Sequence, residues 1–469
     1  MFKRKKNFMK KVILFLNAII FMIVFSSSYA YMSPEEMEKR LNELLKIIKL
    51  QQKEIERLKK ELEMQKKIQQ QILNQQIKRK ELELEKKVKA QQKTIEKIKK
   101  SIPSWIKKIK ISGDLRLRYE GIFNRKEKQK DGSLKDIKDR QRYRFRARLF
   151  LDAPISDEIS AHIMLCTNQD KNREATTANQ NFSDDFNDKG IYIHRAYAVY
   201  KPKWLKGLEL GGGKFKNTFL HTDIIWDPDV NPEGFYERYQ YLKFKTFQPF
   251  IHLGQMVVNE VNKGKDAYLY IYQLGSDINF KKFKWTIAGS YYNWYRLEAS
   301  KWLKNAEYKG GGGNTYVLKN GELDYAYDYD LWEVISFLKF KVKSIPVKLI
   351  FDYVENFADH VPSSKDSAYY LGFVFGSSKK KGDFSLSYKY AYIENDAVIG
   401  SLNDQNFYGA NRKGHKIKLR YRLLDNLEFA LAYFHTKPVH DWDVNSPTFK
   451  NNKIREREDR LQSDVILKF

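Results

Sequence analysis

The chain has 469 residues, 86 Lys and Arg against 58 Asp and Glu, and a formal net charge of +28 at pH 7. Its mean hydropathy is −0.64, and charges interrupt every apolar run after residue 30, which excludes spanning helices there. The single cysteine, Cys166, excludes an intrachain disulfide, and the strand pattern around it indicates packing. The eight His residues lack metal-ligand spacing, and no phosphate loop or nucleophile elbow occurs. We therefore expect no metal, no cofactor and no enzymatic activity.

Residues 1–30 have the three parts of a secretory signal peptide. Six Lys or Arg lie in the first eleven residues, an apolar run extends from Val12 to Phe25, and the small residues Ser28 and Ala30 precede Tyr31. The alternative is a membrane anchor, but the run is shorter than the about 20 apolar residues that a spanning helix needs. Export also argues against nucleic acid as the partner of so basic a chain, and favours anionic lipid, cell-wall polymer or permeating anions.

Residues 31–104 predict a coiled-coil stalk. Pro and Gly are absent from 35–102, and the good helix formers Glu, Lys, Gln, Leu and Ile dominate. Apolar residues follow two heptad registers that are out of phase near 75–79, first Leu41, Leu44, Ile48, Ile55, Leu58, Leu62 and Ile72, then Ile77, Leu84, Val88, Ile95, Ile98 and Ile102. A single solvated helix or a disordered segment is the alternative, but Leu and Ile at seam positions favour an oligomeric coil. Pro103 ends the helix.

From residue 105 the hydrophobic period changes to two, which predicts half-buried strands to the end of the chain. About sixteen such segments occur, an even number as in bacterial outer-membrane barrels. The expected fold of 105–469 is therefore an all-β transmembrane barrel of antiparallel strands. The spans are 107–121, 141–151, 158–167, 190–201, 205–217, 235–246, 248–258, 266–279, 282–295, 329–342, 346–357, 367–376, 382–395, 414–424, 426–436 and 460–469.

The connections sort by length. Turns after the even segments are short, whereas those after the odd segments are mostly long and polar, as at 122–140, 168–189 and 296–328. Outer-membrane barrels place short turns on one rim and long loops on the other. A soluble β-sandwich has no reason to sort loops in this way, and no blade repeat indicates a propeller.

Several stretches resemble the putative-porin and phosphate-selective porin families of Gram-negative bacteria. They are Ser112 to Tyr119, Arg142 to Phe150, Lys214 to Asn217, Asn231 to Phe235, and the terminal Phe469, and the likeness covers most of 110–469. The resemblance implies a homotrimer of barrels in the outer membrane, with Phe469 as the signal for the assembly machinery. The long coil departs from these families and is closer in plan to porins that hold the envelope layers together through a periplasmic stalk.

Two basic strips predict the channel lining, because Arg facing lipid near the midplane would cost about 2–4 kcal/mol each. The strips share one face of their strands and consist of Arg116, Arg118, Arg142, Arg144, Arg146 and Arg148, then Lys416, Lys418, Arg420 and Arg422. One interpretation is an anion path, since rings of Arg and Lys are the usual device of anion pores. The other is a wall that carboxylates such as Asp114, Asp352 and Asp383 balance.

The connection 218–234 holds four acids that form a candidate constriction loop, Asp223, Asp227, Asp229 and Glu233. Folded inward, it would set acids against the basic wall and create a transverse field, whereas a plain surface loop is the alternative. Three function classes follow. A passive, anion-preferring pore is favoured over a structural tether to peptidoglycan or another cell-wall polymer through the coil. A phospholipase-like barrel enzyme is weakest, because no catalytic constellation is visible.

Overall fold

The computed structural model describes residues 33–101, 103, 105–168, 175–183, 185–300, 312–443 and 455–469. The chain divides into two compact units, 1–102 and 103–469. The signal peptide expected at 1–30 lies outside the described residues. Among the described residues, no helix is both long and apolar enough to cross a membrane.

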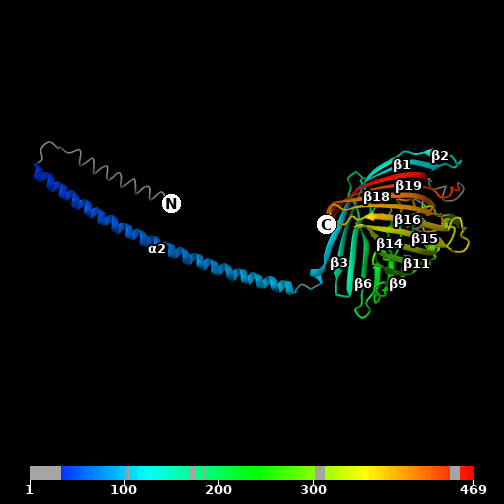
Figure 1. Cartoon of the computed structure of the whole chain (residues 1–469), viewed down its shortest axis with the longest axis horizontal. Coiled ribbons are helices and arrows are strands. Elements are labelled where there is room, and N and C mark those ends of the chain that lie inside the picture. Colours follow the sequence, from blue (N-terminus) through cyan, green and yellow to red (C-terminus); the bar gives the residue numbers. More distant parts are fainter. Residues whose placement is uncertain are drawn as a thin grey trace. The chain divides into compact units, whose positions relative to one another are not determined.

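Among its described residues the first unit contains one helix, α2 (Pro34–Ser101), of 68 residues (Figure 1). Its first turn carries Glu35 and Glu36, which favour a helix start because they face the positive end of the helix dipole. Twenty Lys and Arg stand against twelve Glu along it. Except for Leu44, which is half-buried, and Ile102, which lies outside the described residues, the apolar side chains of both heptad registers, such as Leu58 and Ile95, are exposed on this single helix.

The second unit is a closed antiparallel barrel. Within the described residues, sixteen long strands form its wall, and each overlaps one of the sixteen spans that the sequence predicts. In order around the barrel they are β1 (Lys110–Lys128), β3 (Arg140–Pro154), β4 (Ile159–Thr167), β6 (Ile191–Tyr200), β7 (Leu208–Lys214), β8 (Glu233–Gln240), β9 (Phe247–Asn259), β10 (Ala267–Asn279), β11 (Phe283–Tyr295), β14 (Asp330–Val342), β15 (Ile345–Asn356), β16 (Ser367–Gly376), β17 (Phe384–Ile393), β18 (Arg412–Leu424), β19 (Leu427–Lys437) and β20 (Arg455–Lys468).

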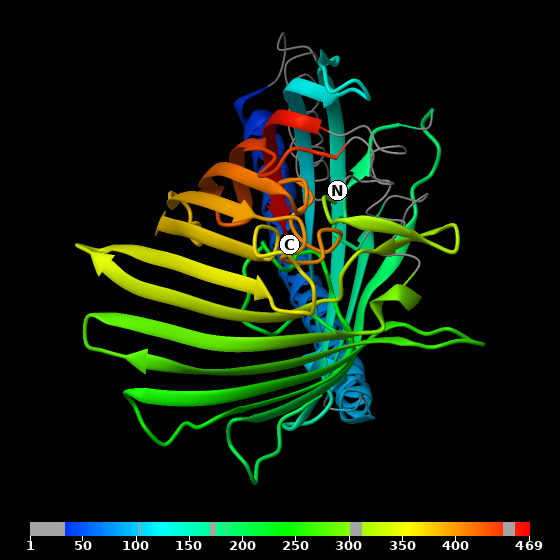
Figure 2. The same cartoon turned by 90° about the vertical axis from the view of Figure 1, so that its right-hand side faces the viewer.

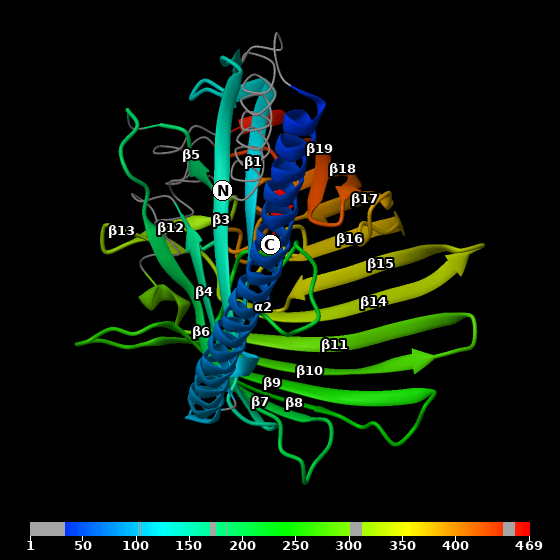
Figure 3. The same ribbon diagram turned by 90° about the vertical axis from the view of Figure 1, so that its left-hand side faces the viewer.

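Pairing between the first and last strands closes the barrel. Leu115 of β1 pairs with Leu467 of β20, and the backbone of Gly113 exchanges hydrogen bonds with Phe469 at 2.8 and 3.1 Å. The curved wall is visible in Figure 2, and Figure 3 shows the hairpins β10–β11 and β14–β15 side by side. Along β1, exposed Leu115 and Leu117 alternate with buried Arg116 and Arg118. The apolar face therefore points outward and the charged face inward, as expected of a barrel in lipid.

Shorter elements decorate this wall. Two of them, β2 (Leu134–Asp136) and β5 (Gln180–Asn181), extend the sheet beside β1 and β3, whereas β12 (Tyr316–Lys319) and β13 (Glu322–Tyr325) form a separate hairpin that the sequence did not predict. Single 3-10 turns lie at η1 (Ile106–Lys108) and η2 (Leu297–Ala299).

The connections differ strongly between the two rims. When the sixteen wall strands are counted in chain order, with β1 first and β3 second, the connections after the even strands have two to seven residues. The connections after the odd strands have seven to thirty-four residues. Because β1 begins and β20 ends on the rim of short turns, the chain preceding the barrel enters at that rim. The connections after the even strands therefore form a rim of short turns, and those after the odd strands form a rim of long connections.

Three long connections contribute to the largest hydrophobic core. Fully buried side chains in this core come from the β7–β8, β11–β14 and β17–β18 connections, and they include Phe215, Ile224, Trp226, Tyr316, Tyr329, Val398 and Phe407. They pack against inward side chains of the wall such as Leu269, Tyr292 and Val354. These connections therefore fill part of the barrel interior.

Candidate functional site

Closure of the barrel joins two basic strips that lie about three hundred residues apart in the sequence. Arg116 and Arg146 sit opposite each other on β1 and β3, and β20 and β19 separate β1 from β18, which carries Lys416. Between these strands and the inward connections lies a cavity of about 340 Å³. Its wall comes from β1, β3, β18, β19 and β20, and its cover from the β4–β6, β7–β8 and β17–β18 connections.

Basic side chains outnumber acidic ones in this cavity. Eight basic residues line it, namely Arg116, Arg118, Arg146, Arg148, Lys416, Lys418, Arg420 and Lys468. Five acidic residues also line it, namely Asp114, Asp227, Asp229, Asp404 and Glu428. The lining therefore carries a formal excess of three positive charges.

Carboxylates of the wall hold several of the arginines. Asp114 accepts from Arg146 Nη2 at 2.8 Å and from Arg148 Nε at 2.8 Å. Asp464 accepts from Arg118 Nε at 2.6 Å and from Nη2 at 2.8 Å, a two-pronged geometry that fixes the guanidinium plane. These pairs reduce the self-repulsion of like charges on neighbouring strands.

Four basic groups of the cavity have no such acid. Among the described residues, no carboxylate lies within 4.0 Å of the charged groups of Arg116, Lys418, Arg420 or Lys468. The Nη2 of Arg116 donates to Asn179, and its buried Nε lacks a protein acceptor. These are the groups best placed to act on an anion.

Three residues of the predicted strips lie outside the cavity. Arg142 and Arg144 approach Glu120 instead, with Arg144 Nη1 3.6 Å from Glu120 Oε2. Arg422 donates to Glu428 at 2.6 Å and to the Ser378 carbonyl at 2.7 Å. They share the inward face with the others but sit at a different height along their strands.

The four acids of the predicted constriction loop do not all lie at the cavity. Asp227 and Asp229 line the cavity. Asp223 binds Lys389 at 2.7 Å and Lys416 at 3.3 Å beside it. Glu233 instead begins β8, is 61% exposed and pairs with Lys214 at 2.6 Å, because the connection ends one residue earlier.

The charge environment separates the two aspartates of this loop. Burial raises the pKa of Asp227 well above its usual range, and the neighbouring carboxylates Asp229 and Asp404 raise it further. Burial also acts to raise the pKa of Asp229, but Arg146, Arg116 and Arg148 outweigh it and hold the pKa below its usual value. The pKa values of the two carboxyls are therefore shifted in opposite directions.

Sequence reasoning missed the β17–β18 connection. Asp404 accepts from Lys416 Nζ at 2.9 Å and lies 3.8 Å from Lys389 Nζ, so these lysines outweigh burial and lower its pKa. Its backbone N–H donates to the Asp223 carbonyl at 3.0 Å. The connection has no helical or strand period, so only its acids could have drawn attention. Of the balancing acids expected earlier, Asp352 binds Thr222 instead and Asp383 lies in a turn.

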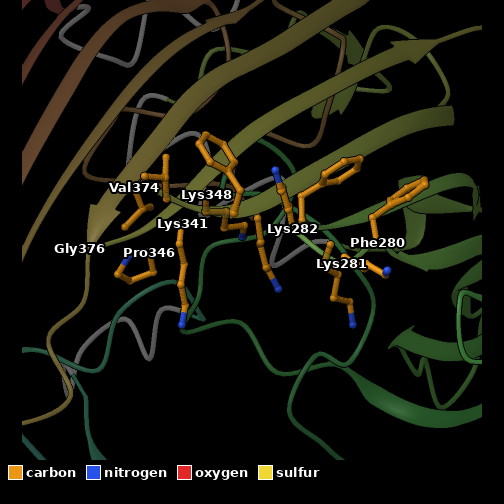
Figure 4. A pocket seen from close by; sticks show the side chains of 13 residues that line it. Phe280, Lys281, Lys282, Lys341, Pro346, Lys348, Val374 and Gly376 are labelled. Carbon is orange, nitrogen blue, oxygen red and sulfur yellow. The ribbon is translucent and has the colours of Figure 1, made fainter. Parts of the chain in front are cut away.

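A second cavity, of about 740 Å³, opens at the short-turn end of β11, β14 and β15 (Figure 4). Six lysines and no acid line it, namely Lys281, Lys282, Lys284, Lys339, Lys341 and Lys348. Lys339 pairs directly with Lys284 and with Lys348 on the neighbouring strands. Along β14, Lys339 alternates in step with Ile335 and Phe337, whose buried side chains point inward. This row of lysines therefore lies on the interior face of the wall.

The structure also shows where Cys166 and Phe469 lie. Cys166 is buried beside Met164 and Ala178, where burial suits the packing role expected for it. Phe469 is 67% exposed after β20, and its ring occupies the space over Gly113, where a Cβ would lie 2.5 Å from it. Within the described part of the chain, no group of three His, Cys, Asp or Glu could hold a metal ion.

The family model described as "Putative porin" matches residues 63–139 and 133–312, more than half of the chain. A comparison with curated proteins gives no match.

Solved structures to which this chain is similar include the following three, each at low sequence identity. OprB of Pseudomonas putida aligns at 9% identity over 77% of this chain and 94% of its own, with a TM-score of 0.48. OmpF of Salmonella typhi, solved with daunomycin, aligns at 11% over 77% and 97%, with a TM-score of 0.44. The channel DcaP of Acinetobacter baumannii aligns at 13% over 77% and 97%, with a TM-score of 0.41.

Proposed function

Because the chain belongs to the putative porin family, we propose that it forms a water-filled outer-membrane channel through which small hydrophilic solutes diffuse, with a preference for anions. The observation that carries the preference is the lining of the 340 Å³ cavity, with eight basic against five acidic side chains. The proposed channel is passive and non-enzymatic.

The mechanism is electrostatic. Fixed positive charge inside a low-dielectric tube raises the local concentration of anions. Arg118, Arg146 and Arg148 are oriented by Asp464 and Asp114, whereas Lys418 and Arg420 have no ion-pair partner among the described residues. The oriented arginines would shape the path, and the unpaired groups would supply most of its net field.

The lysine row at the short-turn mouth extends the same field. Lys284 pairs with Asp277 at 3.0 Å, but among the described residues Lys339 and Lys348 have no carboxylate within 4.0 Å. Lys348 Nζ instead stands 3.7 Å from the centre of the Phe337 ring. An anion that leaves the first cavity would therefore meet a second basic surface before the mouth.

Reversal potentials in planar bilayers test this function. In a gradient of dilute KCl the wild-type channel should favour chloride, and less so in concentrated KCl, because the Debye length falls from about 10 Å at 0.1 M to about 3 Å at 1 M. Replacing Lys418→Glu and Arg420→Glu should shift the reversal potential toward potassium and keep the current, since both charges lack partners that the change would orphan.

Lys263→Glu and Lys265→Glu provide the matched control. They reverse two charges in the β9–β10 connection, outside both cavities, and should leave the selectivity unchanged. A wild-type channel that favours potassium would contradict the anion preference. Absence of any current from folded protein would contradict the channel itself.

The same proposal includes a homotrimer with the coil on the periplasmic side. Support comes from the exposed Leu and Ile of both heptad registers on α2, which a lone helix would leave in water. The chain enters the barrel on the short-turn rim, which faces the periplasm in barrels of this type. Cleavage of the signal peptide after Ala30 and a stalk over 31–104 complete the proposed organisation.

A structural tether is the second candidate function. The observation that favours it is the excess of twenty basic over twelve acidic residues along α2, which suits an anionic cell-wall polymer. Peptidoglycan should then retain the full-length protein, with release at high salt. Retention that high salt leaves unchanged would contradict an electrostatic tether, and the channel could still conduct.

A further inference from the structure

The short turns of one arc of the rim combine lysine with apolar side chains. The arc consists of the turns 201–207, 241–246, 280–282, 343–344 and 377–383, which follow one another around the barrel from β6 to β17. Its eleven lysines stand against one acid, Asp383, and are Lys201, Lys203, Lys206, Lys243, Lys245, Lys281, Lys282, Lys343, Lys379, Lys380 and Lys381. We call this set the basic arc.

The opposite rim shows that the basic arc is not a consequence of a basic chain. The connection 129–139 has three lysines and three aspartates, and 260–266 has two lysines and two acids. The remaining short turns also differ, because 155–158 and 425–426 carry Asp157, Glu158 and Asp425 and no lysine. Positive charge is therefore concentrated on one rim and on one arc of it.

Most lysines of the basic arc are available to an external partner. Lys201 and Lys203 pair with Glu209 and Asp157, but among the described residues the other nine have no carboxylate within 4.0 Å. The one acid of the arc is already engaged, because Asp383 accepts from Ser377 at 2.8 Å and from the backbone N–H groups of Lys379 and Lys380 at 3.0 Å.

Exposed apolar side chains lie between these lysines. Trp204 is 74% exposed in the first turn and Phe244 is 58% exposed in the second. Phe280 stacks on Phe283 at 4.3 Å in the third, next to Lys281 and Lys282. Phe280 nevertheless remains 48% exposed, so all three aromatic side chains keep a large part of their surface in contact with solvent.

We propose that the basic arc binds the headgroups of anionic phospholipids in the leaflet that the short turns reach. Aromatic side chains favour the boundary between headgroups and acyl chains, and lysines beside them extend to the phosphates. Anionic lipid attracts basic groups near its surface, and exposed aromatic groups gain by entering the same layer. The arc thus fits a lipid surface with a negative charge and an apolar interior.

Apolar side chains decide between a lipid and a soluble anionic polymer. A polymer in water would engage the lysines and leave Trp204, Phe244 and Phe280 in contact with solvent, whereas a lipid leaflet covers both kinds of group. The outward strand faces that continue from these turns carry Leu349, Phe351 and other exposed apolar residues. The turns therefore adjoin surface that already faces acyl chains.

Tryptophan quenching in reconstituted vesicles tests the proposal. The full mature chain is placed in phosphatidylcholine vesicles that contain phosphatidylglycerol, with bromine on the acyl chains of one lipid or the other. The difference between the wild type and Trp204→Phe isolates the signal of Trp204. We expect stronger quenching by brominated phosphatidylglycerol, reduced at high salt because screening weakens the attraction.

The arc variant replaces Lys206, Lys243, Lys245 and Lys281 with Gln, and the control replaces Lys130, Lys135, Lys138 and Lys263 of the other rim. Both remove four charges, and the heat-dependent gel migration of folded barrels confirms that each variant folds. The preference for phosphatidylglycerol over phosphatidylcholine should fall at least about tenfold in the arc variant, because each lysine near an anionic surface raises the affinity for it about fivefold. The control should keep the wild-type preference.

Three results would overturn the proposal. The wild type could show equal quenching by both lipids, the control could lose the preference as fully as the arc variant, or a soluble polyanion could bind through the arc while phosphatidylglycerol is not preferred. None of these results depends on conductance or ion selectivity, so failure of the lipid site and failure of the channel are separately visible.

Discussion

Lys416 of β18 donates a hydrogen bond to Asp404 of the β17–β18 connection, with 2.9 Å between Nζ and Oδ2. Asp223 of the β7–β8 connection lies 3.3 Å from the same Nζ, and Lys389 of β17 contacts Asp223 at 2.7 Å. Two lysines of the wall therefore hold two connections inside the barrel. The four side chains make the dimensions of the first cavity depend on ion pairs as well as on packing.

We call the four ion-paired side chains Lys389, Lys416, Asp223 and Asp404 the clasp. Replacing Asp404 with Asn should weaken it. Two lysines would then share Asp223 alone, and breaking a buried ion pair by removing one partner typically costs about 3–5 kcal/mol. We expect a folded barrel with larger or noisier single-channel conductance and faster proteolysis of the 394–411 connection. The control Asp359→Asn changes an exposed acid in the β15–β16 connection and should behave as wild type. Wild-type conductance in both variants would show that the clasp does not shape the channel.

A close approach of glycines joins the same connection to that between β11 and β14. A Cβ added to Gly400 would lie 2.1 Å from the Gly312 carbonyl oxygen. Overpacking of this kind costs about 1–3 kcal/mol, so Gly400→Ala should force the two connections apart without disturbing the wall. Conductance should rise and limited proteolysis should cut the connections sooner. Gly289→Ala, where a Cβ meets its nearest atom at 3.8 Å, is the control.

Selectivity should depend on pH through Asp227. Burial, Asp229 and Asp404 raise the pKa of Asp227, while Lys416 opposes them. A raised pKa means that the protonated carboxyl stabilises the folded connection at acidic pH, and that this contribution is lost as the pH rises through the raised value. Ionisation then adds a negative charge to the cavity, so chloride preference should weaken with rising pH. Reversal potentials measured across pH should show the change in the wild type and not in Asp227→Asn.

The coil makes a separate prediction. Leu58 lies at a seam position of α2 and is exposed on the single helix, so Leu58→Asp would place a charge in the interface of an oligomeric coil. Chemical cross-linking in native membranes should yield a trimer from the wild type and at least about tenfold less of it from the variant. Lys59→Asp, one position outside the seam, should cross-link as wild type. A wild type that yields only monomer would contradict the oligomer.

Local periodicity made much of the fold predictable. Alternation of residues such as Leu115 and Arg116 is a property of neighbouring positions, so the sequence alone predicted a span that overlaps each barrel strand. For strands with clear alternation, such as β1 and β18, it also predicted the face that turns inward. The heptads of 41–98 in the same way predicted the long helix. The lengths of the connections predicted which strand ends lie on which rim, because a short hairpin turn can only join neighbouring strand ends on the same rim.

Contacts between distant segments could be decided only by the tertiary structure. Height along a strand assigned Arg146 to the cavity and Arg144 to Glu120, although the two share one face and one sequence pattern. The connection 394–411 has no period, and Asp404 became part of the site because apolar residues such as Phe407 are buried inside the barrel. Glu233 left the site because β8 begins with it. Periodicity reports which side of a strand meets water, but the partner of a charge depends on which other segments the closed wall encloses.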